Sequence, residues 1–354
     1  MTHVAAPTGS GESPKATPGL AGATRMLSVI DSHTAGCTTR IVVGGILSIP
    51  GATMVDKKLH AEQHLTSVRT ALLCEPRGNR EMAGALVTEP TTDEADLGVI
   101  FMDPTTFEHM SGHGSIGVVS AVIETGMVAV TEPVTTVVLD TPVGLVEGRA
   151  RIENGEITSV SVTNVPSFLY VSTKIEVPGI GEVKADVAFG GDTYVIVGTD
   201  DIGVEVDPAN SFALMDIGRA VKKAANEQID YVHPTLPDVD SIGGVRVNTV
   251  PEPSKGHAKE TVIWADSMID RSPCGTGVCA DLAASYAKGL IGVGEQTMHE
   301  SIIGTVFGGK VLAETKVGHL DAVIPEISGR AFITGFNTIL IDPRDPLKDG
   351  FLVY

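Results

Sequence analysis

The chain has 354 residues and a formal net charge of −19 at pH 7, with 25 Lys and Arg against 44 Asp and Glu. This length suffices for two domains with their own cores, and the acidic balance argues against nucleic acid and anionic membranes as partners. The four cysteines are too few and too scattered for a disulfide framework, and no apolar N-terminal stretch resembles a signal peptide or membrane span. We therefore expect a cytoplasmic protein with reduced thiols.

The predicted elements favour strands over helices. Residues 1–25, rich in Gly, Ser, Pro, Thr and Ala, lack periodicity and are expected to form a disordered tail. Strand patterns then occupy residues 26–30, 40–44, 85–87, 134–139, 157–162, 193–197, 245–250, 261–265 and 331–341. Helical patterns occupy residues 55–74, 115–125, 210–226 and 278–288.

This mixture predicts an α+β fold of two domains, each a sheet wrapped around a buried helix. We expect a domain boundary near residues 164–167 and expect the last strands of the chain to return to the first domain. The first domain is then 26–163 plus 326–354, and the second is 164–325.

Two segments of the chain resemble each other. SGHGSIGVVSAVIETGMV starts at Ser111 and CGTGVCADLAASYAKGLI at Cys274, and the shift that aligns these two residues also aligns Gly126 with Gly289. Each copy follows a strand-like run and a loop, opens with two glycines, continues as a small-residue helix and closes with a C-cap type glycine. A duplicated chain of this kind is expected to place Ser111 and Cys274 face to face across a pseudo-twofold axis, with a substrate between them.

A nucleotide-binding interpretation of these glycines is rejected. Gly112, Gly114 and Gly117 fit GxGxxG, and the second copy fits its GxGxxA variant. That fingerprint follows a strand directly, whereas residues 103–110 and 267–273 intervene here. The glycines more simply let backbone amides approach a small carboxylate.

Each singled-out residue also has a plain structural interpretation. Ser111 is a suitable N-cap residue, and Cys274 by itself is a small buried hydrophobe. Asp270 can cap the amides of its own loop, and His113 can be a structural hydrogen-bonding residue. Cys279 fits a packed thiol inside the helix better than a metal ligand, since no second Cys/His pair has zinc-site spacing. We expect no metal.

Six motifs, in family order, resemble the proline racemase family, which includes proline racemase, 4-hydroxyproline 2-epimerase and trans-3-hydroxy-L-proline dehydratase. They are DSHTAG at 31–36, EPRG at 75–78, SGHG at 111–114, FGG at 189–191, DRSPCGTG at 270–277 and ESIIGT at 300–305. The resemblance covers nearly all of residues 26–354 and implies a diaminopimelate-epimerase-like fold. It also implies an active site in the interdomain cleft, no cofactor, an imino acid substrate and a homodimer.

The chemistry of this family explains the residue types. Removing the α-proton of an amino acid without pyridoxal phosphate requires a competent base and amide dipoles that disperse the charge growing on the carboxylate. A thiol at a helix N-terminus has a lowered pKa, so Cys274 is expected to be that base. By the resemblance, Gly112, His113, Gly275 and Thr276 bind substrate.

Asp270 faces the ring nitrogen in this scheme, while Cys37 has no predicted role. The racemases of the family use a second cysteine where this chain has Ser111, and a serine hydroxyl is a far weaker acid or base. Dehydration needs only one base, so the main expectation is a trans-3-hydroxy-L-proline dehydratase that forms Δ1-pyrroline-2-carboxylate. The alternatives are a 4-hydroxyproline 2-epimerase or proline racemase, including a bifunctional enzyme, and a protein that binds an imino acid without turnover.

Overall fold

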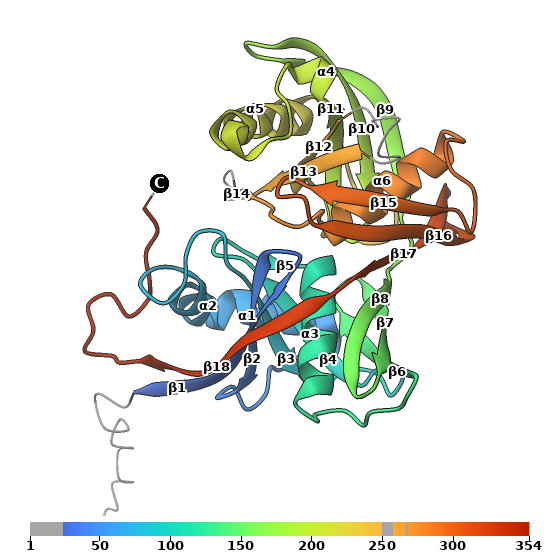
Figure 1. Ribbon diagram of the computed structural model, residues 1–354. Coiled ribbons are helices and arrows are strands. Elements are labelled where there is room, and N and C mark those ends of the chain that lie inside the picture. The colour runs from blue at the N-terminus through green and yellow to red at the C-terminus, as the bar shows by residue number, and fades with distance from the viewer. Residues whose placement is uncertain (1–23, 250–257, 266–267, 354) are drawn as a thin grey trace, which may run out of the picture.

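The chain forms two lobes joined by a long strand, as Figure 1 shows for the computed structural model, which describes residues 24–249, 258–265 and 268–353. Nearly all of the expected tail, and the last residue of the strand predicted at 245–250, lie outside the described residues. The first strand begins at Arg25, close to the predicted start of the fold.

The first lobe combines sheet with three helices. Its strands are β1 (Arg25–Thr34), β2 (Cys37–Gly44), β3 (Ala83–Thr88), β4 (Leu97–Met102), β5 (Phe107–Glu108), β6 (Val134–Thr141), β7 (Gly144–Glu153), β8 (Glu156–Thr163) and β18 (Ala331–Ile341). Its helices are α1 (Met54–His64), α2 (Thr66–Leu73) and α3 (Gly112–Glu124). The single helix predicted at 55–74 is interrupted at Leu65, whose φ of −117° and ψ of 6° leave helical geometry.

The second lobe repeats the arrangement. Its strands are β9 (Phe168–Val177), β10 (Gly181–Phe189), β11 (Thr193–Gly198), β12 (Gly244–Asn248), β13 (Ala258–Trp264), β14 (Met268–Ile269), β15 (Gln296–Ser301), β16 (Val306–Val317) and β17 (Leu320–Gly329). Its helical segments are α4 (Thr199–Ile202), the short 3-10 turn Pro208–Asn210, α5 (Ser211–Gln228) and α6 (Gly275–Ala287).

Strand pairing confirms the predicted duplication. In the first lobe β2 pairs parallel with β3 and β4 pairs parallel with β6, while in the second β11 pairs parallel with β12 and β13 pairs parallel with β15. A two-residue strand, β5 or β14, then pairs with β4 or β13 just before each central helix. The α+β fold with two similar halves is therefore confirmed.

The two central helices fill the lobes. Residues 112–123 of α3 are all buried, because small and apolar side chains surround the helix on every face. In α6 the buried face includes Val278, Cys279 and Leu282. The glycines that follow these helices, Gly126 and Gly289, both have a φ of +70°, the left-handed conformation of a helix C-terminus.

Two chain segments cross between the lobes. The segment after β8 and strand β17 lie side by side, since the Asn164 amide donates to the Pro325 carbonyl at 2.9 Å and Ser167 and Val323 exchange two backbone hydrogen bonds. β17 itself pairs with β16 of one lobe and β8 of the other. We propose these crossings as the limits of the two domains, 26–163 plus 326–354 and 164–325.

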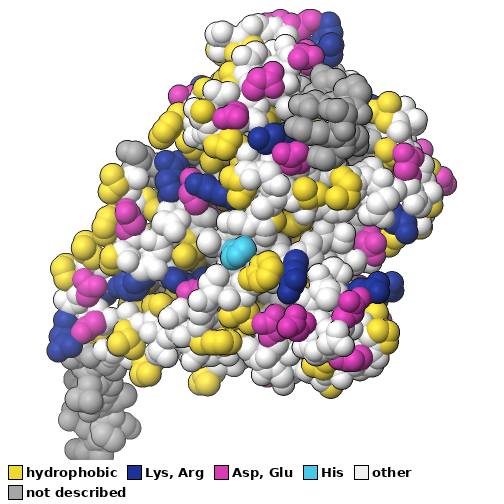
Figure 2. Space-filling model, in the orientation of Figure 1, with side chains coloured by type: hydrophobic (Ala, Val, Ile, Leu, Met, Phe, Trp, Pro, Cys, Tyr) yellow, Lys and Arg dark blue, Asp and Glu magenta, His cyan; other side chains and the backbone are white. Residues whose placement is uncertain are grey.

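On the face drawn in Figure 2, Lys and Arg side chains lie singly or in small groups among Asp and Glu. Within the part of the chain that the structure describes, no helix is long and apolar enough to cross a membrane.

Candidate active site

The N-termini of α3 and α6 meet at the junction of the lobes. A Cβ placed on Gly112 would lie 2.5 Å from the Cα of Gly275, so both positions require glycine for close approach. The first amides of an α-helix have no acceptor within the helix. The junction thus brings together two sets of such donors, which is the arrangement that binds a carboxylate.

Ser111 precedes α3 in the N-cap position but does not act as a cap. Its backbone is extended, with φ −138° and ψ 119°, and its side chain makes no capping hydrogen bond. The Ser111 carbonyl instead accepts from the amide and the hydroxyl of Ser115. A Cβ at Gly114 would lie 3.0 Å from Ser111 Oγ, so this glycine leaves room for the hydroxyl.

Cys274 precedes α6 in the corresponding position, and its backbone is strained. Its φ of 61° is rare for a residue with a side chain, and such conformations concentrate at functional sites. Gly277 leaves room for the Cys274 sulfur, because a Cβ at Gly277 would lie only 3.1 Å from Sγ. Gly114 leaves room for Ser111 Oγ in the same way. Tyr194 Oη lies 3.6 Å from Cys274 Sγ and 2.7 Å from Thr276 Oγ1.

The expectation of a lowered pKa for the Cys274 thiol is wrong, because its pKa is raised. Burial raises its pKa most and the Asp270 charge raises it further. Hydrogen bonds from Tyr194, the Gly277 amide and Thr276 lower the pKa, but by less. Desolvation penalises the thiolate more than the donors favour it, so the net shift of the Cys274 pKa is upward.

Asp270 is buried at the start of the loop that leads to Cys274. Its Oδ1 accepts from the Ser272 amide at 2.7 Å and the Ser272 hydroxyl at 2.9 Å, and Ser272 Oγ in turn accepts from the Cys274 amide at 3.1 Å. The capping role anticipated for Asp270 is therefore present. Arg246, fully buried and paired with Glu260, donates to the carbonyl of Pro273 and supports the same loop.

His113 and Cys37 lie beside Asp270. The imidazole is buried and its Nε2 has no hydrogen-bond partner, while burial lowers its pKa. The Cys37 thiol is hydrogen-bonded to the Asp270 carboxylate, and its pKa is raised mainly by burial. One donor atom from each of the three side chains lies within 4.8 Å of the others. The resemblance had placed His113 and Asp270 at the substrate, but no sequence pattern indicated that Cys37 lies beside them.

Ser111 and Cys274 line one small pocket between the lobes, together with His113, Asp270 and Thr276. Its volume of about 30 Å³ leaves room for roughly two water molecules. The pocket wall also contains residues that the sequence analysis did not identify: Ala83, Glu108, Met110, Asp192, Tyr194, Val262 and Trp264. Gly112 and Gly275 have no side chain with which to line the pocket. They belong to the site because they open the two helices whose N-termini meet there.

Two of these wall residues are acidic. Glu108 comes from β5 of the first lobe, and Asp192 follows β10 of the second. Burial raises the pKa of both carboxyl groups, and neighbouring acidic groups, including Asp103, raise it further. Lys and Arg are missing from the described residues that line this pocket.

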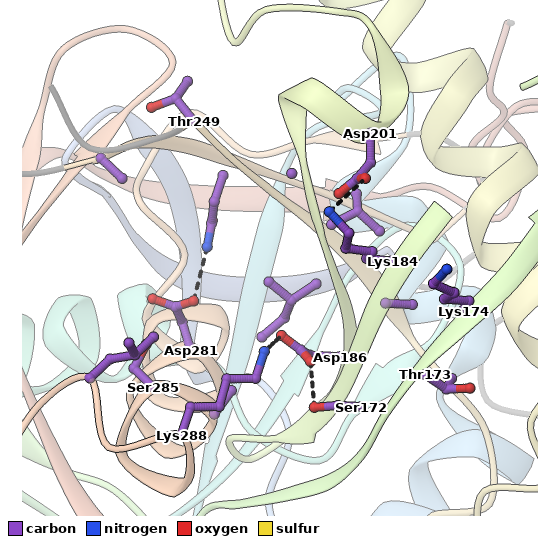
Figure 3. Close-up of a pocket in the computed structure, with 18 residues that line it drawn as sticks. Ser172, Thr173, Lys174, Lys184, Asp186, Asp201, Thr249, Asp281, Ser285 and Lys288 are labelled. Carbon is purple, nitrogen blue, oxygen red and sulfur yellow. Dashed lines mark hydrogen bonds and ion pairs between the residues drawn. The ribbon is translucent and has the colours of Figure 1, made fainter. Parts of the chain in front are cut away.

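A larger hollow of about 660 Å³ lies elsewhere in the second lobe, against β9, β10, β11 and α6. Figure 3 shows that ion pairs cross it, including Lys288 with Asp186 and Lys184 with Asp201. It shares no described residue with the pocket of Ser111 and Cys274. The three lysines that line this hollow, Lys174, Lys184 and Lys288, each pair with a carboxylate.

The comparison with known proteins decides the family. The family model described as proline racemase matches residues 29–352. The chain belongs to the proline racemase family. It is 46% identical to the proline racemase of Acetoanaerobium sticklandii over 329 residues, covering 92% of this chain and 98% of that protein. It is 42% identical to the 4-hydroxyproline 2-epimerase of Streptosporangium roseum, covering 93% and 99%.

A solved structure of a proline racemase family relative agrees. The hydroxyproline epimerase of Agrobacterium vitis, with bound trans-4-hydroxy-L-proline, superposes with a TM-score of 0.89 at 33% identity, covering 93% of this chain and 95% of that one. The recognition made from six motifs, and the fold that it implied, are confirmed.

Proposed function

We propose that this family member is a 4-hydroxyproline 2-epimerase that moves protons at Cα with Cys274 and Ser111. The observation that carries the proposal is that both side chains stand at opposed helix N-termini and line one pocket. The dehydratase, our first expectation from the sequence, becomes the second candidate, because the relatives described above are named as racemases and epimerases.

Substrate binding uses the polar groups already described. The amides that open α3 and α6 receive the carboxylate, so Gly112, Gly275 and Thr276 act through their backbone. Asp270 and the free Nε2 of His113 receive the ring ammonium. Once the ammonium neutralises Asp270, the charge that raises the pKa of Cys274 is offset, which favours the thiolate.

The reaction then needs two proton transfers. The Cys274 thiolate takes the α-proton and becomes a thiol, while the electron pair left on Cα spreads into the carboxylate held by the helix amides. The Ser111 hydroxyl gives its proton to the opposite face of Cα and regains one from water. The Cys274 thiol then passes the proton that it took to the hydroxide left behind, which restores the thiolate and the water. The product therefore carries one solvent hydrogen at Cα.

A hydroxylated ring suits this pocket better than proline. Glu108 and Asp192 remain after the carboxylate and ammonium are bound, and proline has only CH₂ groups to place against them. A ring hydroxyl can donate to one of these carboxyl groups and accept from the other if that one is protonated, whereas proline offers neither hydrogen bond. A site built to hydrogen-bond a substrate hydroxyl discriminates against analogues that lack it by about 10⁴- to 10⁵-fold in kcat/KM.

The dehydratase is kept as a second candidate because position 111 holds a hydroxyl. In that reaction Cys274 takes the α-proton of trans-3-hydroxy-L-proline, the C3–O bond breaks, and the hydroxide leaves as water after protonation. The enamine tautomerises to Δ1-pyrroline-2-carboxylate.

Proton NMR of the purified protein in deuterium oxide tests these proposals with trans-4-hydroxy-L-proline and trans-3-hydroxy-L-proline in separate samples. Formation of cis-4-hydroxy-D-proline deuterated at Cα supports the epimerase, and an imine product supports the dehydratase. Cys274→Ser should abolish formation of either product. Cys279→Ser is the control, because Cys279 is a buried thiol of α6 packed into the core, and this variant should still form the product. Absence of exchange with both substrates contradicts both candidates.

We also propose a cytoplasmic location and a homodimer. All four cysteines are free, which suits a reducing compartment. Size-exclusion chromatography with light scattering tests the dimer.

A further inference from the structure

We propose that Cys37, His113 and Asp270 form a binding site for a zinc-type divalent cation, which inhibits the enzyme by occupying the place of the substrate ammonium. The three donors come from separate parts of the chain: the start of β2, the first turn of α3, and the loop before α6. The site therefore exists only when the two lobes are together.

The donor set fits this class of ion. A thiolate, an imidazole nitrogen and a carboxylate oxygen are the ligands that Zn²⁺ prefers, and three protein ligands leave a position for water. Tetrahedral ligands at zinc bond lengths of about 2.0–2.3 Å lie roughly 3.3–3.8 Å apart. The observed donor atoms all lie within 4.8 Å of one another, so side-chain movements of about 1 Å bring them to the ion.

One of the donors is free for a ligand. Among the residues that the structure describes, His113 Nε2 has no hydrogen-bond partner although the residue is only 7% exposed, and a buried polar atom without a partner is costly. The Thr34 hydroxyl donates to the His113 carbonyl at 2.9 Å, which helps to hold this turn in place.

The surroundings also favour a cation. Glu108 and Asp192 line the same pocket, and its described wall lacks Lys and Arg. When the ion binds, the Cys37 S–H bond is broken, its proton passes to solvent, and the sulfur lone pair forms the bond to the metal. Asp270, which is hydrogen-bonded to Cys37 in the unliganded protein, then binds the metal instead.

The main rival is a metal held by Cys274, and single variants distinguish the two thiols. Chelator-treated protein is titrated with Co²⁺ under anaerobic conditions, and thiolate coordination is followed by its sulfur-to-cobalt charge-transfer absorbance. Wild type, Cys274→Ser and the matched control Cys279→Ser should each bind one equivalent with this band. Cys37→Ser should lose the band and weaken binding by more than about 100-fold, since even outer-shell changes cost 10- to 100-fold.

An unchanged band in Cys37→Ser, or its loss in Cys274→Ser, overturns the proposal. His113→Asn, which cannot supply the imidazole, provides a second test and should also weaken Co²⁺ binding, with circular dichroism confirming that each variant is folded. Zn²⁺ should inhibit wild type competitively with the imino acid and spare Cys37→Ser. The spectroscopic readout does not depend on turnover, so it stands even if the proposed epimerase activity is not found.

Discussion

Gly275 lies against Gly112 so closely that a Cβ on Gly275 would come within 2.7 Å of the Gly112 Cα. The same Cβ would lie 2.5 Å from Ile327 Cδ1, a side chain of β17. These contacts set the distance between the two helix N-termini, and with it the separation of the Ser111 and Cys274 side chains. The glycines of the two motifs thus have a packing role in addition to leaving amides open.

Gly275→Ala should separate the helix N-termini and impair catalysis. Overpacking of this kind typically costs about 1–3 kcal/mol, so we expect a lower denaturation midpoint together with a fall in kcat. Gly292→Ala is the control, because the nearest atom to its Cβ, Glu295 Oε2, would be 3.9 Å away. Urea denaturation and the NMR assay measure both effects. Wild-type stability and turnover in Gly275→Ala would show that the contact does not set the site geometry.

Ser111→Cys should raise epimerisation relative to dehydration. A thiol is a much better acid and base than a hydroxyl, so both faces of Cα would then have a competent group. General acid–base groups contribute about 10²–10⁴-fold, and we expect a gain of at least 10-fold in the ratio of epimer to imine. If the ratio stays constant, residue 111 does not select the reaction.

Tyr194→Phe should make the Cys274 thiol harder to ionise. The Tyr194 hydrogen bond lowers the pKa of Cys274, so its loss moves the folded-state pKa further up and the thiolate appears only at higher pH. Alkylation of Cys274 by iodoacetamide, followed by mass spectrometry across a pH series, should show a midpoint displaced to higher pH. Tyr170→Phe removes a phenol that bonds to the Asp230 carbonyl outside the pocket and should leave the midpoint in place.

His233→Asn should reduce the loss of stability in acid. His233 Nδ1 accepts from the Thr235 and Leu236 amides, and burial lowers its pKa to about 4. In the unfolded chain this histidine has a pKa of about 6.5. Between about pH 6.5 and 4 the unfolded chain therefore binds a proton that the folded protein does not bind, so the free energy of unfolding falls as pH falls.

This one group contributes a slope of at most about 1.4 kcal/mol per pH unit over that range. The side-chain oxygen of the introduced asparagine can accept the same amides without titrating. Urea denaturation at several pH values between 4 and 7 measures the slope. An equally steep decline in the variant would assign the acid sensitivity to other groups, such as His109, whose pKa burial also lowers to about 4.

The sequence predicted the central helices and the duplication because glycine pairs and small-residue periodicity are local signals. Both helices start three residues earlier than predicted, since Gly112 and Gly275 are themselves helical. Strands such as β9 and β16 were missed, because their solvent faces carry charged and polar residues that interrupt the strand pattern.

The pocket was only partly predictable for a different reason. Glu108, Asp192 and Tyr194 lie near the recognised motifs but have no spacing that marks them. Glu108 reaches the pocket of Cys274 where the lobes meet, and Asp192 and Tyr194 reach it through the packing of the second lobe. The thiol pKa was predicted in the wrong direction because burial, a tertiary property, outweighs the local helix N-terminus. Motifs therefore located the residues that we propose to react, whereas their surroundings could be described only from the fold.

The two crossings between the lobes are hydrogen-bonded to each other at residues 164 and 325 and at 167 and 323. The two crossing segments therefore form one two-stranded ribbon between the lobes and are not two independent connections. A rotation of one lobe against the other would take place about this ribbon, because both connections of the chain run through it. Such a rotation would change the distance between Ser111 and Cys274 while the hydrogen bonds that join the two crossings are kept.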